Sequence, residues 1–394
     1  MTQRKLHILH LPSWYLPEGG QFCRNQVQAL NENGDVYAAV MANVIFSIKK
    51  YGLNAFRFPT KFFLSREDNI DVFRNYHISL PFFKKRDSLK WAKETLKMVE
   101  SYFAAYGKPD LIHVHSVLWG GYAAKLIKDK HKIPYVITEH RGIFGLSCEW
   151  AKNQFITWQD SYMQQAFSNA DLIIPVSEKL IPKISSYLDK PVQIRVISNM
   201  VDSEFFFYNP QKKDNKKNQA VMVNGFSYSK AYDVLFPAAD IALDKIKNLE
   251  IIIIGEDFSG ELFDKLWNKV RNKERITLAG EKNSNDVREA LWSADFFIIS
   301  SRVESQSVST LEALATGLPV VCTEVVPETI ANSVNSIRVP VEDIERLAEA
   351  IISMAENHQS YNKKQIASEI QKIADKKVVA EALLDAYESI LIKK

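Results

Sequence analysis

Short apolar runs alternate with amphipathic stretches along the chain, and this alternation restricts the fold more than any other feature. The apolar runs of the first half, which we expect to be strands, cover residues 6–11, 36–41, 111–115, 135–138, 170–176 and 192–197. The helices expected between them cover 21–33, 89–106, 120–130 and 178–188. Strands that alternate with helices are typical of a parallel sheet with helical crossovers.

The same alternation restarts after a polar, charged stretch at 209–219, which opens near Pro210. The strands expected there cover 220–224, 249–254, 276–279, 296–300 and 319–322, and the helices cover 232–246, 261–271, 285–293 and 308–315. The sequence therefore predicts an α/β protein with two Rossmann-like, doubly wound parallel sheets. Ligands of such sheets bind at the carboxyl ends of the strands, so we expect the two domains to face a central cleft.

The length of 394 residues agrees with two domains, because a single hydrophobic core stops growing at about 250–300 residues. We predict an N-terminal domain over 1–208, a linker over 209–219 and a C-terminal domain over 220–375. A final helix over 376–394 could pack back on the N-terminal domain.

The charge of the chain is unevenly distributed. Residues 1–208 hold 26 Lys and Arg against 19 Asp and Glu, a net charge of +7, whereas residues 209–394 hold 24 against 28, a net charge of −4. The basic half could face an anionic surface or substrate, and ordinary charge scatter explains it equally well. Aromatic and basic residues interleave over 56–58, 61–64 and 82–86. They could rest on an anionic bilayer or be core aromatics beside a solvated basic loop.

Several classes of protein do not fit this sequence. No run of about 18 apolar residues predicts a membrane-spanning helix, and the start does not read as a signal peptide. The three cysteines, Cys23, Cys148 and Cys322, are widely separated and form no CxxC or Cys/His cluster. We therefore expect no disulfide framework, no zinc site and a cytoplasmic location. No nucleic-acid-binding motif is present.

The segment from Ser300 to Val321 carries the most chemical information. Ser305, Ser307 and Ser309 crowd the predicted start of a helix, where free backbone N–H groups and the positive end of the dipole favour an anion. Glu304 and Glu312 stand eight residues apart, and their carboxylates would suit the hydroxyls of a nucleotide sugar. The alternative is an ordinary amphipathic helix with two solvated glutamates, since this spacing alone is a weak pattern.

Glu304 and Glu312, together with the run LEALATGLPVV at 311–321, resemble the signature of the retaining glycosyltransferases of family 4, which have the GT-B fold. Other segments resemble the family in the same order along nearly the whole chain. They are the glycine-bearing loop at 12–20, the histidine-bearing strand ends at 110–115 and 138–140, and the segments at 170–178, 196–202 and 294–301.

The resemblance implies that the N-terminal domain over 1–208 is the acceptor side and that the C-terminal domain over 220–375 binds the nucleotide sugar. It also implies roles for individual residues of the second half. Glu304 would contact hydroxyls of the donor sugar, as a catalytic residue, and Glu312 would bind the ribose. The backbone of Ser305, Gln306, Ser307 and Val308 would lie along the diphosphate.

In the first half, the resemblance implies that Gly19 and Gly20 let the backbone approach the donor phosphates. It places His140 beside the transferred sugar as a second catalytic residue, with His115 as a further candidate. The alternatives are a plain turn at Gly19–Gly20 and packed strand-end histidines, above all His113.

One segment departs from the family pattern. The family commonly has Gly-Arg-x-x-x-x-Lys-Gly after the first strand of the second domain, and the matching run here is Asn224–Asp233. Lys230 stands at the lysine position, but Gly225 replaces the arginine and Ala231 replaces the second glycine. Arg302 or Arg141 could supply the missing cation, or donor binding is weakened.

The resemblance implies a retaining, metal-independent glycosyltransferase without a cofactor. It would move a sugar from a UDP-sugar, or less commonly a GDP-sugar, to a hydroxyl of a lipid-linked or surface polysaccharide such as a capsule. The alternatives are a non-catalytic subunit that binds nucleotide sugar and a GT-B nucleotide-sugar epimerase. The chain would work in the cytoplasm, with the inner face of the membrane as a possible site of contact.

Overall fold

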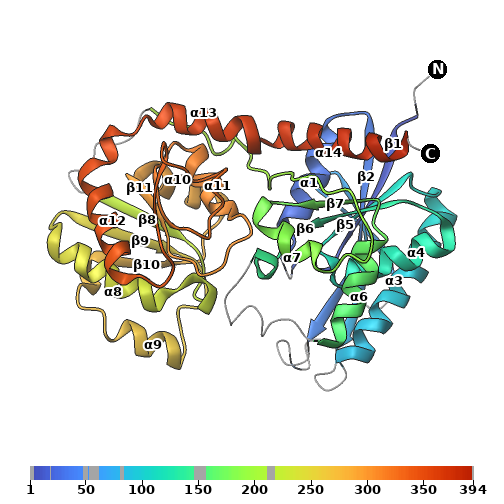
Figure 1. The fold of residues 1–394 in the computed structure, drawn as a ribbon, viewed down its shortest axis with the longest axis horizontal. Coiled ribbons are helices and arrows are strands. Elements are labelled where there is room, and N and C mark those ends of the chain that lie inside the picture. The colour runs from blue at the N-terminus through green and yellow to red at the C-terminus, as the bar shows by residue number, and fades with distance from the viewer. Residues whose placement is uncertain are drawn as a thin grey trace. The chain divides into compact units, whose positions relative to one another are not determined.

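The computed structural model describes residues 4–17, 19–47, 52, 62–79, 84–145, 157–210 and 218–392. The chain forms two compact units, and each is built around one sheet with helices on it (Figure 1). The first unit contains Met1–Ser198 and Val379–Lys394, and the second unit contains Asn199–Val378. Two α/β units with mainly parallel sheets confirm the predicted fold class.

The first unit has a seven-stranded sheet in the order β3-β4-β2-β1-β5-β6-β7. Its strands are β1 (Leu6–Pro12), β2 (Val36–Ser47), β3 (Phe63–Glu67), β4 (Ile70–Ser79), β5 (Leu111–His115), β6 (Tyr135–Glu139) and β7 (Leu172–Pro175). All neighbouring strands are parallel except β3, which runs antiparallel to β4. The central strands are buried along almost their whole length, as expected of a sheet covered on both faces.

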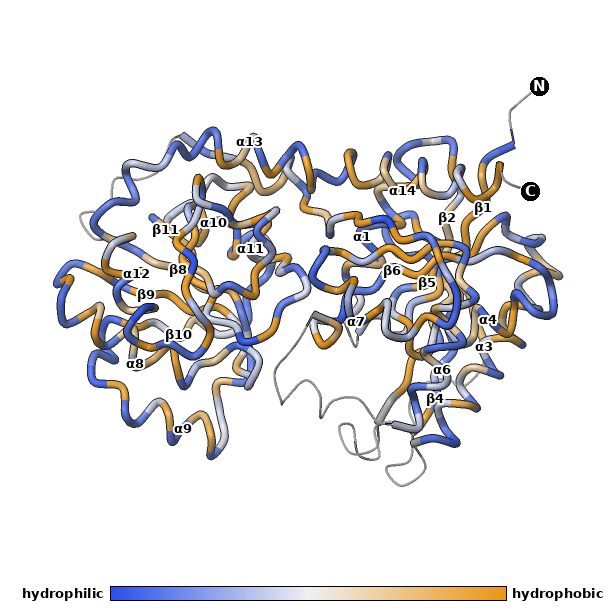
Figure 2. The backbone as a smooth tube through the Cα atoms, viewed as in Figure 1, coloured by the Kyte–Doolittle hydropathy of each residue, from blue (hydrophilic) through white to orange (hydrophobic). Residues whose placement is uncertain are grey.

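The helices of the first unit are α1 (Gln21–Glu32), α3 (Lys84–Tyr106), α4 (Tyr122–His131), α6 (Thr157–Ser168), α7 (Ile181–Ser185) and most of α14 (Lys376–Leu391), with short helical turns at Val117–Gly121, Gly142–Gly145 and Glu178–Leu180. The hydrophobic core contains fully buried side chains from α3 and the strands, among them Trp91 and Tyr135. Figure 2 shows the hydrophobic colouring concentrated along the strands.

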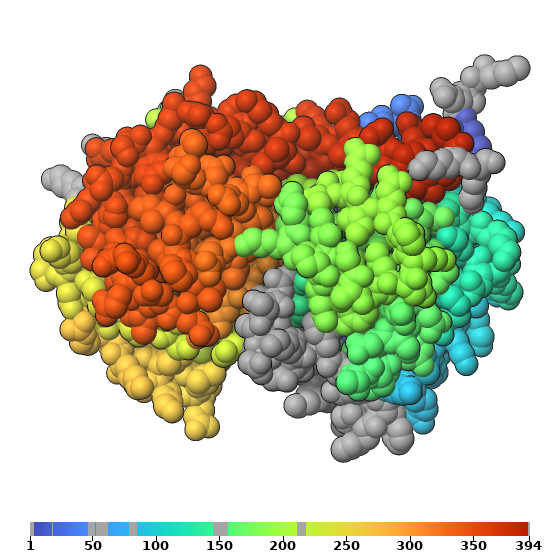
Figure 3. All heavy atoms as spheres, viewed as in Figure 1, coloured from blue at the N-terminus to red at the C-terminus, as the bar shows by residue number. Residues whose placement is uncertain are grey.

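The second unit has a six-stranded, entirely parallel sheet in the order β10-β9-β8-β11-β12-β13. Its strands are β8 (Asn218–Val223), β9 (Leu249–Ile254), β10 (Ile276–Gly280), β11 (Phe296–Ile299), β12 (Val320–Thr323) and β13 (Ser336–Val339). Its helices are α8 (Tyr232–Lys245), α9 (Glu261–Trp267), α10 (Ser284–Ser293), α11 (Val308–Ala315), α12 (Ile344–Asn357) and α13 (Lys363–Ala374), with short turns at Tyr228–Lys230, Lys273–Arg275 and His358–Ser360. Helices α12 and α13 form much of the visible face of this unit in Figure 3.

Two elements of the first unit differ from the sequence-based expectation. The run 192–197 is not a strand, since only Ile194 forms an isolated bridge, with Ile173. The helix expected over 178–188 shortens to a turn at Glu178–Leu180 and α7. Pro182 lies inside the first turn of α7, where proline is tolerated, and α7 stops after five residues.

The β3–β4 hairpin was absent from the predicted elements. Its two turn residues, Asp68 and Asn69, both have positive φ, at 44° and 66°. Two consecutive positive φ values are the mark of the turn type that best joins two twisted antiparallel strands. Asp and Asn tolerate that conformation better than other non-glycine residues. The dipeptide Asp68–Asn69 was therefore the signal in the sequence from which the hairpin could have been predicted.

The segment after Ser198 belongs to the second unit, ten residues before the polar stretch at 209–219. The backbone N–H of Val201 donates to the carbonyl of Ala374, and the backbone N–H of Asn199 donates to the Gln306 side chain. At the other end of the chain, α14 packs in the first unit, where the Tyr387 hydroxyl lies 2.6 Å from Nδ1 of His113. Among the described helices, none is long and apolar enough to cross a membrane.

Candidate active site

The loop Ser300–Ser307 connects β11 to α11 at the carboxyl edge of the second sheet, and all eight of its residues are buried. A buried loop must satisfy its polar groups internally. Ser300 Oγ donates to the carbonyl of Lys230 at 2.8 Å, and Thr323 Oγ1 donates to the carbonyl of Ser301 at 2.6 Å. These bonds join the loop to the turn that follows β8 and to the last residue of β12.

Lys230 and Glu304 form an ion pair in this loop region. Lys230 ends the short turn Tyr228–Lys230 after β8, and its Nζ lies 2.5 Å from Oε1 of Glu304. Ser301 Oγ donates to the same carboxylate oxygen at 2.9 Å. The pair arises because β8 and β11 are adjacent parallel strands, so the loops that follow them leave the sheet at the same edge.

The helix α11 starts beside Glu304 with a capped N-terminus. Ser307 is the N-cap, and its Oγ accepts a hydrogen bond from the backbone N–H of Thr310 at 3.3 Å. Val308, the first helical residue, is exposed. The first turn of a helix presents backbone N–H groups and the positive end of the dipole, a suitable place for phosphate.

Gln306 bonds to Asn199 through both its side chain and its backbone. Its Oε1 accepts from the backbone N–H of Asn199 at 2.5 Å, and its carbonyl accepts from Nδ2 of Asn199 at 3.0 Å. These bonds tie the loop to the start of the second unit. Gln306 thus stabilises the loop through its side chain, and the predicted diphosphate contact of its backbone stays a prediction.

Glu312 lies in the second turn of α11 and is half-buried. Burial raises the pKa of its carboxyl group to about 7. Within the described part of the chain, no hydrogen bond or ion pair engages this carboxyl group. It is therefore a carboxyl group that could take a hydroxyl partner, near its midpoint of titration at neutral pH.

Arg302, one of the two arginines expected to replace the missing cation, is engaged in structural contacts. Its Nη1 and Nη2 donate to the Asp233 carboxylate at 2.9 and 2.6 Å, and its Nε donates to Glu342 at 2.8 Å. The guanidinium also lies over the Tyr228 ring, 4.4 Å from the centroid. With its charge neutralised by two carboxylates, Arg302 fastens the turn around Tyr228 and leaves Lys230 as the cation paired with Glu304.

The two positions that depart from the family pattern have distinct local geometries. A Cβ added to Gly225 would lie 3.2 Å from the carbonyl oxygen of Glu256, so the segment after β8 passes close to the segment after β9. Ala231 has φ +54°, in the left-handed region, although it is not glycine. The backbone conformation that usually requires glycine is therefore kept, at a cost of about 1 kcal/mol.

In the first unit, Gly19 and Gly20 follow β1 with φ of +93° and +86°. A Cβ added to Gly20 would lie 2.6 Å from the carbonyl oxygen of Trp14, so only glycine fits at this position. Gly20 is also the N-cap of α1. The turn itself explains Gly20, and contact of these glycines with donor phosphates stays a prediction.

Three histidines at the ends of neighbouring strands form a hydrogen-bonded column in the first unit. Nε2 of His140 lies 3.2 Å from Nδ1 of His115, and Nε2 of His115 lies 2.9 Å from Nδ1 of His10. The His140 ring also stacks on Phe22 of α1 at 3.9 Å. Burial lowers the pKa of His10 to about 3 and that of His115 well below its usual value, so both rings are neutral.

His115 and His140 were candidates from the sequence, but the inclusion of His10 was missed. The hydrogen bond between His10 and His115 depends on the register of β1 against β5. This register places Pro12 beside His115 and His10 beside His113. His113 itself is a packed strand histidine, bonded to Thr138 and Tyr387.

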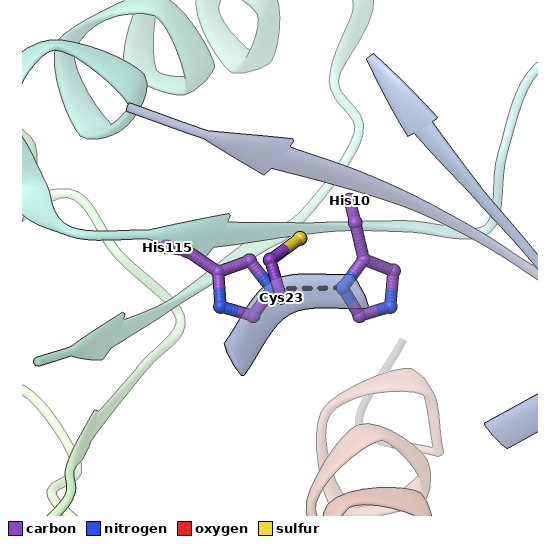
Figure 4. Close-up of side chains that lie close together, drawn as sticks. All are labelled: His10, Cys23 and His115. Carbon is purple, nitrogen blue, oxygen red and sulfur yellow. Dashed lines mark hydrogen bonds between the residues drawn. The ribbon is translucent and has the colours of Figure 1, made fainter. Parts of the chain in front are cut away.

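His10, Cys23 and His115 lie side by side in the core, with potential ligand atoms within 4.8 Å of one another (Figure 4). The geometry favours a hydrogen-bonded histidine pair over a metal centre for two reasons. The two facing nitrogens point at each other along their hydrogen bond. Among the described residues, Nε2 of His10 has no hydrogen-bond partner, whereas the outer nitrogen of a metal-bound histidine usually has one.

Arg141, the second candidate for the missing cation, follows β6 in the chain and is half-buried. Its backbone N–H donates to Oε1 of Glu139 at 2.9 Å, and its guanidinium lies 6.0 Å from the centre of the Phe144 ring. The fully buried Glu139 also accepts from Ser116 Oγ and the backbone N–H of Val117. Glu139 thus organises the loops after β5 and β6, a role that no pattern in the sequence indicates.

Family models match both halves of the chain. Residues 55–205 match Glycosyltransferase Family 4, and residues 217–357 match Glycosyl transferases group 1. The putative teichuronic acid biosynthesis glycosyltransferase TuaC of Bacillus subtilis is 25% identical over 273 residues, which are 65% of this chain and 63% of that protein.

Solved structures share the fold. Sucrose-phosphate synthase from Thermosynechococcus elongatus aligns with a TM-score of 0.80 and 18% identity, covering 98% of this chain and 100% of that one. Anabaena HepE in complex with UDP aligns with a TM-score of 0.71 and 15% identity, covering 98% and 100%. These similarities confirm the expected fold.

Proposed function

Because the two halves of this chain belong to Glycosyltransferase Family 4 and to Glycosyl transferases group 1, we propose that the chain transfers a sugar from a UDP-sugar to a hydroxyl of a lipid-linked or surface polysaccharide, with retention of configuration and without a metal. The observation that carries the proposal is the Lys230–Glu304 ion pair beside the start of α11. At the carboxyl edge of the second sheet, the pair brings together a cation, a carboxylate and a helix N-terminus. These are the groups that bind a nucleoside diphosphate sugar.

In the proposed reaction, the bond between the anomeric carbon and the diphosphate oxygen breaks, and a bond to the acceptor oxygen forms on the same face. The hydroxyl proton of the acceptor passes to the departing diphosphate. Lys230 and the first amides of α11 stabilise the negative charge that grows on that diphosphate. These groups supply the charge neutralisation that a metal ion provides in other transferases.

Glu304 is proposed to hold hydroxyls of the donor sugar, and Glu312 to hold the ribose. Both assignments follow the family resemblance. The unpartnered, half-buried state of Glu312 among the described residues supports its role, since a carboxyl group held away from water gains from new hydroxyl partners. His140 is proposed to act on the transferred sugar, with Gly19 and Gly20 near the donor phosphates.

The choice of donor and acceptor rests on the similar proteins. HepE was solved with UDP, which supports UDP over GDP. TuaC is named for the synthesis of teichuronic acid, which supports a polysaccharide acceptor.

Contact with an anionic membrane is part of the proposal. It rests on the exposed residues Lys85 and Arg86 at the start of α3. Residues 56–58, 61 and 82–83 of the predicted aromatic and basic surface lie outside the described residues. Co-sedimentation with vesicles of phosphatidylglycerol should exceed that with phosphatidylcholine, and equal sedimentation would contradict this contact.

A second candidate function is a non-catalytic subunit that binds nucleotide sugar. Gly225 at the arginine position and the engagement of Arg302 with Asp233 and Glu342 favour it. This reading predicts nucleotide binding without turnover on any acceptor. The epimerase alternative predicts free sugar and nucleoside diphosphate from the donor alone.

Thermal denaturation with UDP, GDP, ADP, CMP and their sugar conjugates tests the donor. A ligand that binds only the folded protein raises Tm by mass action. An increase of Tm with UDP and UDP-sugars supports the donor class. Release of UDP that depends on an added acceptor then supports transfer. No increase with any nucleotide would overturn the proposal.

A further inference from the structure

A surface hollow of about 440 Å³ lies in the first unit, between the loop after β1 and the β3–β4 hairpin. It is lined by Leu16, Pro17, Phe63, Ser65, Glu67, Arg74 and Tyr76. The volume falls within the about 300–1,000 Å³ that is usual for small-molecule sites. None of the residues assigned to the donor lines it, so the hollow requires its own explanation.

The hairpin gathers these side chains because of its register. Phe63 pairs with Arg74 and Ser65 pairs with Val72 across the two antiparallel strands. Directly paired residues lie on the same face of a sheet, and so do residues two apart along one strand. Phe63, Ser65 and Glu67 of β3 therefore share one face with Arg74 and Tyr76 of β4, and Leu64 points to the other.

Among the described residues that line the hollow, Glu67 and Arg74 are the only charged ones, and they neutralise each other. Arg74 Nε and Nη2 donate to Oε1 of Glu67 at 2.9 and 2.7 Å, and Nη2 also donates to Oε2 at 2.8 Å. Nη1 donates to the carbonyl of Leu16 at 2.7 Å. Each guanidinium nitrogen thus has a partner in the protein. An anion entering the hollow would face an already neutralised cation and a carboxylate that repels it.

The remaining lining is suited to a ligand that is apolar on one side and hydroxylated at its edge. The rings of Phe63 and Tyr76 lie 5.8 Å apart at 46° and supply two aromatic surfaces. Leu16 and Pro17 add apolar contact. From the described residues, Oε2 of Glu67 accepts one hydrogen bond, whereas Oε1 accepts three, from Ser65 Oγ and from two nitrogens of Arg74. A carboxylate oxygen has about two acceptor sites, so Oε2 can accept a further hydroxyl.

A pyranose ring has this combination of surfaces, with C–H groups on its faces and hydroxyls around its edge. We infer that the hollow binds a neutral sugar ring of the acceptor, an inference that rests on the proposed transferase function. Leu16 and Pro17 belong to the same loop as Gly19 and Gly20, the predicted contacts of the donor phosphates, and the Arg74–Leu16 hydrogen bond fastens this loop to the hairpin.

Saturation-transfer NMR on the full chain tests the inference, with methyl glycosides of glucose, galactose and N-acetylglucosamine as neutral probes and glucuronate as the anionic probe. At about 10 mM, we expect signals from at least one neutral glycoside. Phe63→Ala should weaken its affinity about three- to tenfold, the range for loss of one aromatic contact. Leu64→Ala is the matched control, because this neighbour lies on the opposite face and is 47% exposed.

A second variant tests whether the neutralised charge of Arg74 excludes anions from the hollow. Glu67→Gln keeps the shape of the side chain but removes the charge that neutralises Arg74. Glucuronate, which should bind the wild-type protein more weakly than the neutral glycosides, should bind this variant more tightly than it binds the wild type. Circular dichroism and the Tm of each variant establish that the hairpin is folded.

Three outcomes would overturn the inference: no signal from any neutral glycoside, equal losses from Phe63→Ala and Leu64→Ala, or tighter binding of glucuronate than of the neutral probes to the wild type. UDP binding, measured on the same samples, separates this inference from the proposed function. If the protein binds UDP but no neutral glycoside, only the acceptor subsite is refuted. Glycoside binding without any nucleotide binding would refute the transferase instead.

Discussion

Nζ of Lys230 lies 2.5 Å from Oε1 of Glu304, although 74 residues separate the two in the sequence. Both side chains are largely shielded, at 21% and 8% exposure. In the proposed reaction, the bound donor changes the surroundings of both groups, since the diphosphate attracts Lys230 and the sugar hydroxyls approach Glu304. The pair thus holds the two groups in place before the donor arrives, which limits the ordering cost of binding.

Glu304→Gln should abolish sugar transfer, with a loss of at least about 100-fold in kcat, as for removal of a transition-state contact in other enzymes. The amide has nearly the same shape and can still accept a hydrogen bond from Lys230 or Ser301. The Tm should therefore change little. UDP release in the presence of acceptor measures the effect, and Glu349→Gln, an exposed glutamate in α12, is the control. Near-normal turnover would refute the role of Glu304.

Lys230→Ala should weaken UDP binding about 10- to 100-fold, the range expected for the loss of one charged hydrogen bond to phosphate. Lys245→Ala removes an exposed lysine from the last turn of α8 and should leave the affinity unchanged. Isothermal titration with UDP measures both. If the two variants bind UDP equally well, the loop after β8 has no part in donor binding.

Glu312 should make the protein less stable as the pH rises from about 4.5 to about 7. Its pKa is raised from 4.5 to about 7 by burial, so in this range the unfolded chain loses a proton that the folded chain retains. Below pH 4.5 both states are protonated, and the stabilising contribution is fully present.

Glu312→Gln removes this titration. Its Tm relative to that of the wild type should be higher at pH 8 than at pH 4.5, whereas Glu345→Gln, an exposed position in α12, should show no such difference. A constant difference across this range would contradict the raised pKa. The variant should also bind UDP less tightly if Glu312 holds the ribose.

The histidine column should have the opposite effect on stability. The pKa values of His10 and His115 are lowered by burial, so below about pH 6.5 the unfolded chain binds protons that these rings cannot accept in the folded state. Their contribution to stability is present above pH 6.5 and is lost as the pH falls. Nitrogen-detected NMR of the imidazoles should show both rings neutral at pH 5.5, and imidazolium signals from either would refute the prediction.

His115→Phe should lower the transfer rate about tenfold without changing UDP affinity, because it removes the hydrogen bond that orients His140. The substitution also leaves Nδ1 of His10 without a partner, at a cost of about 1–3 kcal/mol in stability. A changed imidazole spectrum of His140 distinguishes positioning from simple destabilisation. An unchanged spectrum together with an unchanged rate would exclude the positioning role.

Gly20→Ala should destabilise the first unit more than Gly34→Ala does. Both glycines have φ of +86°, so both substitutions incur the same backbone strain of about 1 kcal/mol. Only at Gly20 would the new Cβ collide with backbone, at 2.6 Å from the carbonyl oxygen of Trp14, whereas Gly34 has nothing within 4 Å. Urea denaturation should show a difference above about 1 kcal/mol, and equal losses would contradict the close approach.

The alternation of strands and helices was readable from the sequence because it depends on local properties. Apolar runs such as 249–254 and 296–300 nearly coincide with β9 and β11. The position of Glu304 in the loop after a strand and of Glu312 in the second turn of the helix followed from the same pattern. Where the local signal was weak, as at 192–197, the expected strand was wrong.

By itself, the sequence determined the fold class and the two sheets. It also determined which residues lie around the start of α11, and it carried the family resemblance. Each of these depends on residues that are close together in the chain. The tertiary structure decided which distant side chains meet. It paired Lys230 with Glu304, engaged Arg302 with Asp233, and brought His10 to His115 across 105 residues. Such contacts depend on strand order and register, which bring together residues far apart in the chain and carry no periodic signal in the sequence.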